Sequence, residues 1–315
     1  MTTTLCLPFD AATIARAVAL IDRGLPVAVP TETVYGLAAD ATRGPAVAAI
    51  YAAKGRPSFN PLIVHVSDLA AATALAALPP PALRLAEHFW PGPLTIVAPL
   101  RAGAAVAALA TAGLPTVALR VPAHPVMRAL LAAAGRPLAA PSANASGTIS
   151  PTRAAHVLRS LGGRIPLVID GGACAVGLES TIVAVTEDGV RLLRPGPVAP
   201  AEIEQVAGLA IQAREARAGA IEAPGQLAHH YAPSKPVRLG ATHAAAGEWL
   251  IGFGAVAGDA SLSPGGDLVE AAARMFDLLH QADAAPAGRI AVAPVPDEGI
   301  GRAINDRLRR AAMPR

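Results

Sequence analysis

One segment near the N-terminus combines strands, a helix and a dense set of polar side chains, and it constrains the fold more than any other part of the chain. A short apolar run at 27–29 predicts a buried strand. Pro45 suits the first position of a helix and Gly55 suits its end. The apolar run at 61–66 predicts the next strand. Hydroxyl-bearing and charged side chains gather after the first strand, and we interpret the whole segment as the active site.

Two cations, Lys54 and Arg56, flank the glycine at the predicted helix end. Arginine offers a planar fork to phosphate oxygens and lysine offers a mobile point charge, so the pair suits a polyanion such as ATP. The alternative is a solvated helix end, where each cation complements the helix dipole by about 0.3–1 kcal/mol. On charge alone, the solvated helix end is the favoured interpretation.

Strand alternation predicts the faces on which His65 and Arg120 lie. In the strand at 61–66, a period of two places His65 on the face opposite Leu62, Val64 and Val66. In the strand TVALRV the same period puts Arg120 on one face with Thr116 and Ala118. An inward-facing arginine needs an anion, which is either a ligand carboxylate or an acidic side chain of the protein. For His65 the alternative is a core histidine whose hydrogen bonds are satisfied.

Three short motifs occur in order in this region: PTETVYGL at 30–37, KGR at 54–56 and NPLIVH at 60–65. Together they resemble the signature of the YrdC-like domain of the threonylcarbamoyl-AMP synthase family, which runs PTET-x-YGL, K-x-R and NPL-x-x-H. Further motifs extend the resemblance, namely WPGPLT at 90–95, PSANASG at 141–147 and RPG at 194–196.

A later segment, APGQLAHHYAP at 223–233, resembles the S-P-G-x-x-x-x-H-Y-x-P segment of the two-domain branch of this family. Ala223 replaces the usual serine, and Gln226 and Leu227 stand where a methionine and a basic residue are common. The ending GIGRAINDRLRRAA also looks like the two-domain branch. The resemblance therefore spans the chain, with most of its motifs between residues 26 and 196.

A chain of 315 residues is long for one core, so two domains are expected. We place a YrdC-like catalytic domain at 1–210, a linker that acts as a lid over the active site at 211–236, and a small C-terminal domain at 237–315. The resemblance implies an α/β fold in which a twisted mixed sheet with helices forms the site on its concave face. Predicted strands and helices after residue 236 indicate a small, Rossmann-like α/β unit.

The resemblance implies an enzyme, a nucleotidyltransferase that makes L-threonylcarbamoyl-adenylate. Its substrates would be L-threonine, bicarbonate or CO2, and ATP, and it would release pyrophosphate. The product would pass to the tRNA threonylcarbamoyl-transferase machinery for N6-threonylcarbamoyladenosine (t6A) modification of tRNA, and a direct contact with tRNA is left open. Mg²⁺ would accompany ATP, with no protein side chain assigned as its ligand.

The family motifs also imply roles for individual residues. Five residues would bind L-threonine: Thr33, His65, Arg120, Ala140 and Ser180. Seven residues would hold ATP: Arg56, Asn60, Thr116, Ser142, Ser150, Arg194 and Tyr231. Lys54 would act with Arg56 in catalysis, close to the phosphates and magnesium, and Arg120 would grip the threonine carboxylate.

Composition argues against a membrane protein and against a cysteine-based scaffold. Hydrophobic residues make up 53% of the chain but aromatic residues only 3%, and the uncharged run at 102–119 contains two glycines and a proline. The first residues lack the basic region and apolar core of a signal peptide. Cys6 and Cys174 belong to no C-x-x-C motif. A cytoplasmic protein is therefore expected.

Two other functions compete with the synthase. A carbamoyl-transferring hydrogenase maturation protein shares the YrdC-like domain, but that class carries paired C-x-x-C zinc motifs, which this sequence lacks. A non-catalytic binding module for double-stranded RNA or tRNA is weakly allowed by the net charge of +3, although no lysine- or arginine-rich block occurs. Turnover of ATP separates both from the synthase.

Overall fold

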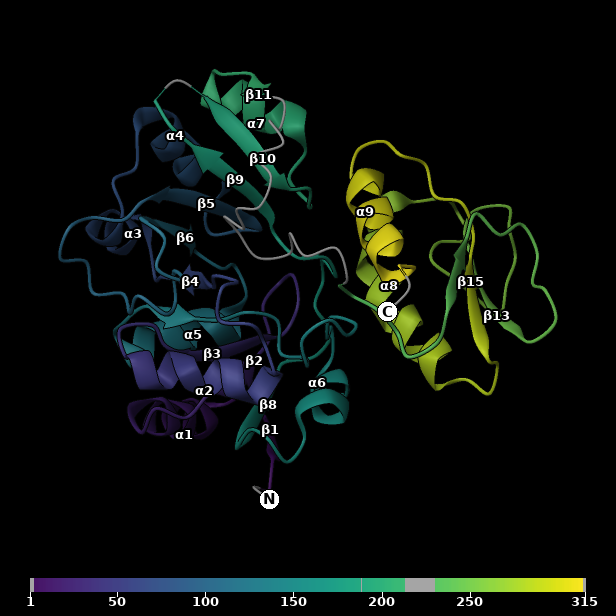
Figure 1. Cartoon of the computed structure of the whole chain (residues 1–315), viewed down its shortest axis with the longest axis horizontal. Coiled ribbons are helices and arrows are strands. Elements are labelled where there is room, and N and C mark those ends of the chain that lie inside the picture. The colour runs from purple at the N-terminus through teal and green to yellow at the C-terminus, as the bar shows by residue number, and fades with distance from the viewer. Residues whose placement is uncertain (1–2, 188, 213–229, 314–315) are drawn as a thin grey trace.

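The structure is a computed structural model that describes residues 3–187, 189–212 and 230–313, and it contains two β-sheets with helices packed against them (Figure 1). The strands of the large sheet are β1 (Leu5–Pro8), β2 (Val27–Val29), β3 (Gly36–Asp40), β4 (Ile63–His65), β5 (Leu94–Pro99), β6 (Thr116–Arg120), β7 (Leu138–Ala139), β8 (Leu167–Asp170), β9 (Thr181–Val185), β10 (Val190–Arg194) and β11 (Ile211–Gln212). The helices of this part are α1 (Ala11–Asp22), α2 (Gly44–Lys54), α3 (Leu69–Leu75), α4 (Pro80–Phe89), α5 (Pro125–Ala134), α6 (Ala154–Leu161) and α7 (Pro200–Ala207).

The large sheet mixes parallel and antiparallel pairs in the order β1-β8-β2-β3-β7-β4-β6-β5-β9-β10-β11. Strand β4 lies between β6, which runs parallel to it, and β7, which runs antiparallel. A mixed sheet with helices is the expected architecture, so the predicted fold class is confirmed. In the register of β4 and β6, His65 lies beside Arg120, which makes these two predicted site residues neighbours.

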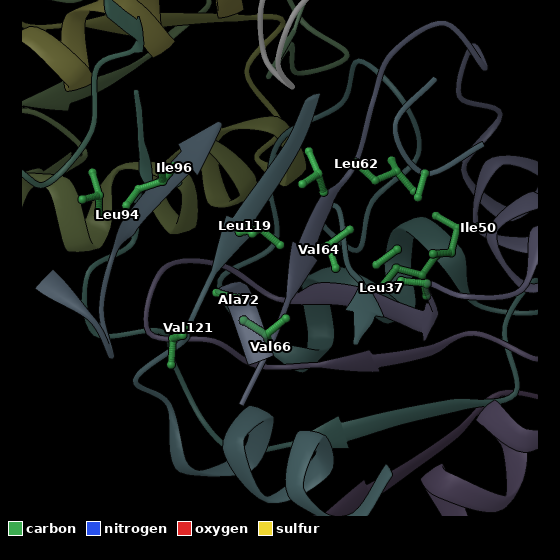
Figure 2. Close-up of a cluster of buried hydrophobic side chains, with 14 of the residues drawn as sticks. Leu37, Ile50, Leu62, Val64, Val66, Ala72, Leu94, Ile96, Leu119 and Val121 are labelled. Atoms are coloured by element: carbon green, nitrogen blue, oxygen red, sulfur yellow. The ribbon is translucent and has the colours of Figure 1, made fainter. Parts of the chain in front are cut away.

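Apolar side chains from one face of the sheet form the main core, which Figure 2 shows. Val64 from β4, Leu119 from β6 and Ile50 from α2 are fully buried in it. Burial of a side chain of this size stabilises the fold by about 1.5–3 kcal/mol. Because successive strand residues point to opposite faces, Ile63 and His65 point away from this core and line a cavity on the other face. The predicted orientation of His65 is confirmed.

Helix α2 begins and ends close to where the sequence predicts. Pro45 lies in its first turn, where the missing N–H removes no helical hydrogen bond. Gly55 ends the helix with a left-handed φ of 59°, a conformation that favours glycine. Ile50 and its apolar neighbours anchor the helix in the core. The helix therefore delivers Lys54, and the following turn delivers Arg56, to one end of the sheet.

The C-terminal part forms a second, all-parallel sheet in the order β12-β15-β13-β14. Its elements are β12 (Val237–Leu239), β13 (Glu248–Gly252), β14 (Ala260–Ser261), α8 (Leu268–Ala284), β15 (Arg289–Val292) and α9 (Gly301–Ala311). Helices α8 and α9 lie between this sheet and the larger part of the molecule (Figure 1). The parallel sheet with its helices agrees with the Rossmann-like unit expected here.

The boundary placed at residue 210 falls within the large sheet, because β11 pairs in parallel with β10. Residues 213–229 lie outside the described residues, and with them most of the predicted lid, including Ala223, Gln226 and Leu227. The described chain resumes at His230. Close to that point, the backbone N–H of Ala232 donates to the carbonyl of Gly147 across 2.9 Å. The described end of the predicted linker therefore lies against the loop at 141–147.

The uncharged run at 102–119 is not helical. Its first part forms turns, one of them at Gly113 with a φ of 75°, and its last part is β6. In the described part of the chain, no helix has the length and apolar character needed to cross a membrane.

Candidate active site

One cavity lies on the face of the large sheet opposite the core of Figure 2, and it gathers most of the predicted site residues. Strands β4 and β6 contribute His65 and Arg120, and the loop between β2 and β3 contributes Thr33. Nine of the predicted residues line this cavity: Thr33, Arg56, His65, Arg120, Ala140, Ser142, Ser180, Arg194 and Tyr231. They come from segments far apart in the sequence, so the fold is what brings them together.

Lys54 does not line the cavity, although we expected it near the phosphates. It is buried, and its Nζ donates to the carbonyls of Ser142 and Asn144, each across 2.5 Å. Burial, and secondarily the charge of Arg56, lower the pKa of Lys54 well below its usual range. In this structure Lys54 therefore acts as a support that fixes the loop at 141–147 beside the cavity.

Three other predicted residues do not line the cavity. The side chain of Asn60 is buried, and neither amide atom has a hydrogen-bond partner among the described residues. Ser150 is fully buried and donates through Oγ to Oε1 of Glu179 across 2.5 Å. Thr116 is half-buried at the beginning of β6. Their predicted contacts with ATP remain predictions.

Arg120 is held by three hydrogen bonds beside the hydroxyls of the first motif. Its Nη1 donates to Thr33 Oγ1 (3.0 Å), its Nε to the carbonyl of Gly92 (3.1 Å), and its Nη2 to Glu32 Oε1 (2.6 Å). Burial alone would raise the pKa of Glu32, but the charge and hydrogen bond of Arg120 bring it below its usual range. The sequence offered two anions for Arg120, a ligand carboxylate or an acidic side chain of the protein. The acidic side chain is present and is that of Glu32, and Arg120 also lines the cavity.

His65 is buried next to Arg120 and stays neutral at physiological pH. Burial, reinforced by the positive charge of Arg120, lowers its pKa to about 3. Its Nδ1 has no hydrogen-bond partner among the described residues. A buried unpartnered ring nitrogen is unfavourable, so it fits a position that a bound ligand completes.

Two further arginines give the cavity a positive lining. Arg56 donates to the carbonyls of Asn60 (3.2 Å) and Pro61 (2.9 Å), and Arg194 donates to the carbonyl of Ser180 (3.0 and 2.9 Å). Burial lowers the pKa of both arginines to about 10, so both remain charged at neutral pH. Within the described chain, neither forms a salt bridge with a carboxylate. Buried cations without an anionic partner are suited to an anionic ligand.

The cavity also contains residues that sequence reasoning did not assign to the site, notably Glu179 and His230. Glu179 immediately precedes Ser180, a predicted threonine-binding residue. This place in the sequence was the signal that could have identified Glu179 as a site residue. His230 precedes Tyr231, with 4.0 Å between the two ring centroids, and burial lowers its pKa well below the usual range. The H-Y pair of the linker motif was visible, but only its tyrosine was assigned.

Comparison with known families agrees with these motifs and this geometry. A family profile described as "Telomere recombination" (Sua5/YciO/YrdC) matches residues 19–196, and a second, described as "Threonylcarbamoyl-AMP synthase, C-terminal domain", matches residues 198–313. The chain belongs to the two-domain threonylcarbamoyl-AMP synthase family.

Relatives of this synthase family cover nearly the whole chain. A threonylcarbamoyl-AMP synthase of Bacillus subtilis is 40% identical over 95% of this chain and 92% of its own length. One of Pyrococcus abyssi is 40% identical over 94% of this chain and 93% of its own length. The crystal structure of Pyrococcus abyssi Sua5 complexed with L-threonine matches with a TM-score of 0.88 and 37% identity, over 99% of this chain and 98% of that one.

Proposed function

We propose that this protein synthesises L-threonylcarbamoyl-adenylate from L-threonine, bicarbonate or CO2, and ATP, with release of pyrophosphate. The product would supply t6A modification of tRNA. The observation that carries the proposal is one cavity lined by three buried arginines, Arg56, Arg120 and Arg194. Arg120 lies among threonine hydroxyls and the other two lie without carboxylate partners in the described chain, an arrangement that suits an amino acid next to a nucleotide.

Arg120 is the residue that we assign to the threonine carboxylate. A guanidinium has five N–H donors, and the bonds to Gly92, Thr33 and Glu32 use three of them. The remaining two belong to Nη1 and Nη2, which together form the fork that binds a carboxylate in two-pronged fashion. Thr33 and His65 would contact the rest of the amino acid. The similar Sua5 protein of Pyrococcus abyssi was crystallised as a complex with L-threonine, which supports this substrate.

Arg56 and Arg194 are the residues that we assign to the phosphates of ATP. Hydrogen bonds to carbonyls fix both guanidinium groups, so they are ordered before a ligand arrives. Asn60 supports the assignment, because its buried amide has no partner in the described chain and a nucleotide would provide one. Ser142 and Tyr231 also face the cavity and would complete the nucleotide site.

The chemistry that we propose needs alignment and charge stabilisation, and no protein nucleophile. The neutral amine of threonine attacks CO2, loses a proton to solvent and becomes a carbamate. A carbamate oxygen then attacks the α-phosphorus of ATP, the bond to the β-phosphate oxygen breaks, and pyrophosphate leaves with the electron pair. Buried arginines stabilise the charge that develops on the phosphate oxygens, and the cavity fixes the reacting atoms in line.

Magnesium enters this proposal with the nucleotide. Within the described chain, no group of three or more His, Cys, Asp or Glu side chains is arranged to hold a metal ion. The two carboxylates near the cavity already accept hydrogen bonds from the protein, Glu32 from Arg120 and Glu179 from Ser150. We therefore assign Mg²⁺ to the phosphate oxygens of ATP, where it would neutralise charge on the leaving pyrophosphate.

The proposal extends to the surroundings of the reaction. We place the protein in the cytoplasm and its product with a tRNA threonylcarbamoyl-transferase, because an acyl-type adenylate is short-lived in water and needs an acceptor at hand. The maturation-protein alternative lacks support from the sequence, which has no paired C-x-x-C motifs. The RNA-binding alternative does not require a cavity of this kind.

Pyrophosphate release tests the proposal. Purified protein is incubated with Mg²⁺ and ATP, and threonine and bicarbonate are then omitted one at a time. We expect release only when all components are present, and we expect the Arg120→Lys variant to need much more threonine for the same rate. Equal release with ATP alone would show an ATPase or another nucleotide-hydrolysing activity, and no release under any condition would favour the binding module.

A further inference from the structure

Arg307 of the C-terminal part is fully buried against the catalytic part of the chain, which is unusual for an arginine side chain. It lies on α9, and its Nε donates to Oε2 of Glu179 across 3.1 Å. Its Nη1 donates to the carbonyl of Pro195 (2.7 Å) and to Asp306 Oδ2 (3.0 Å). Two of these three contacts cross from the small domain to the catalytic part, one to Glu179, which lines the candidate active site, and one to Pro195, which follows Arg194.

Both cross-domain contacts are made one residue away from predicted ligand-binding residues. Glu179 precedes Ser180, and Pro195 follows Arg194. Arg194 in turn donates to the carbonyl of Ser180 and, across 3.1 Å, to its hydroxyl. Arg307 therefore contacts Glu179 beside Ser180 and Pro195 beside Arg194, while Ser180 and Arg194 are hydrogen-bonded to each other.

Glu179 needs this partner in order to be compatible with a nucleotide site. It lines the cavity and is 6% exposed, so its carboxylate would repel phosphate groups if it were left without a cation. Arg307 neutralises it through Oε2, while Oε1 accepts the hydroxyl of Ser150, a predicted ATP-binding residue. Removing one partner from a buried ion pair leaves an uncompensated charge.

Arg307 also lies against Tyr231, a residue of the linker motif that lines the cavity. Its guanidinium carbon lies 5.5 Å from the centroid of the Tyr231 ring. This distance fits a cation–π contact, which is strongest between desolvated groups, and both side chains are buried. The same guanidinium thus fixes the position of the tyrosine as well as that of Glu179.

The apolar part of the domain contact follows the same pattern. The core of the C-terminal domain includes Val34, Ile149 and Leu178 of the catalytic domain. These three are the immediate chain neighbours of Thr33, Ser150 and Glu179. The small domain therefore packs directly against the segments that carry the site.

We propose that Arg307 is a positioning residue for the nucleotide site, contributed by the C-terminal domain. It holds Glu179, Arg194 and Tyr231 in the geometry that binds ATP, without touching the nucleotide. The identity of the ligand rests on the proposed function. The proposal gives the C-terminal domain a role in the reaction that no motif in the sequence assigned to it.

Ligand titration of the Arg307→Lys and Arg307→Gln variants tests the proposal. Lysine keeps the charge but cannot reach Glu179, Pro195 and the Tyr231 ring together. We expect Arg307→Lys to weaken ATP binding, measured by calorimetry without co-substrates, roughly 10- to 100-fold, and to change threonine binding much less. Arg307→Gln should weaken ATP binding at least as much. The matched control is Arg309→Lys on the same helix, whose exposed side chain should leave both affinities unchanged.

Titrations of the single and double variants separate positioning from structural support alone. A structural role would reduce the fraction of protein that binds ATP and lower the melting temperature while leaving the dissociation constant as in the wild type, and that result would overturn the proposal. A double variant, Arg307→Lys with Glu179→Gln, tests whether Arg307 acts through Glu179. If it does, the double variant should bind ATP no more weakly than the single variant with the lower ATP affinity. Additive losses of affinity would contradict the route through Glu179. Failure of the wild-type protein to bind ATP would count against the proposed function itself.

Discussion

Arg120 donates to Glu32 across 2.6 Å, and the buried arginine and the partly buried glutamate form an ion pair at the edge of the candidate active site. The pair occupies one N–H of the guanidinium and fixes the plane of the fork. Because Arg120 also lines the cavity, the ion pair and a bound carboxylate are compatible. The acidic partner expected from one interpretation of the sequence is therefore present, and the ligand carboxylate expected from the other stays a prediction.

The first prediction is that Arg120→Lys weakens threonine binding and leaves ATP binding nearly unchanged. An ammonium keeps the charge but loses the two-pronged geometry. A hydrogen bond to a charged group contributes about 1.5–3 kcal/mol, so the apparent affinity for threonine should fall roughly 10- to 100-fold. Separate titrations of the two ligands check this. Parallel losses of both, with a lowered melting temperature, would mean that Arg120 serves only the ion pair with Glu32.

The second prediction is the converse change at Arg56. Arg56→Lys should weaken ATP binding roughly 10- to 100-fold and leave threonine binding close to the wild type, because we assign its guanidinium to the phosphates. The two lysine variants control each other, since both remove a buried guanidinium from the same cavity. If both variants weaken the same ligand, the division of the cavity into two subsites is wrong.

The third prediction concerns Lys54, which holds two carbonyls of the loop at 141–147. Lys54→Met leaves the buried carbonyls of Ser142 and Asn144 without this donor, which should lower the free energy of unfolding by about 1–3 kcal/mol and also weaken ATP binding. Lys235→Met is the control, because Nζ of Lys235 also donates to two carbonyls, outside the cavity. It should lower stability without weakening ATP binding. Full ATP affinity in Lys54→Met would contradict the supporting role.

The fourth prediction is a loss of stability in mild acid that depends on His65. Its pKa is about 3 in the folded protein against an ordinary 6.5, so between these values the unfolded chain binds a proton that the folded chain does not. The free energy of unfolding therefore falls as the pH drops below 6.5, by about 2 kcal/mol at pH 5 from this residue.

Urea unfolding at about pH 7.5 and pH 5 checks the effect of His65, with His65→Gln as the comparison. The decrease between the two pH values should be smaller by about 2 kcal/mol in the variant. His280, whose pKa burial also lowers to about 3, should keep part of the decrease in place. An equal decrease in wild type and variant would show that His65 is protonated in the folded state.

Much of the fold followed from local rules in the sequence. Pro45 and Gly55 marked the ends of α2 because each favours the backbone conformation found there, and the period of two in β4 placed His65 on the cavity face. Such rules involve residues close in sequence. The pairing of β4 with β6, which makes His65 and Arg120 neighbours, depends on contacts across more than fifty residues, and motif order alone does not give it.

The missed features of the site are those that depend on distant partners. The place of Lys54 near the phosphates, implied by the family motif, stays a prediction, but its partners in the structure are backbone carbonyls about ninety residues away, which the sequence did not indicate. Glu179 escaped notice because its roles come from Ser150 and Arg307, one on each side of the domain contact. Hydrogen-bond partners of this kind become visible only once the chain is folded.

The most direct test of the central claim is isotopic labelling of the product. Wild-type protein is incubated with ATP, Mg²⁺, L-threonine and ¹³C-bicarbonate, and the nucleotide products are analysed by mass spectrometry at short times. We predict a threonylcarbamoyl-adenylate that carries one ¹³C atom and that forms in equal amount with pyrophosphate. Formation of ADP, of unlabelled AMP alone, or of an adenylate of threonine without the labelled carbon would contradict the account.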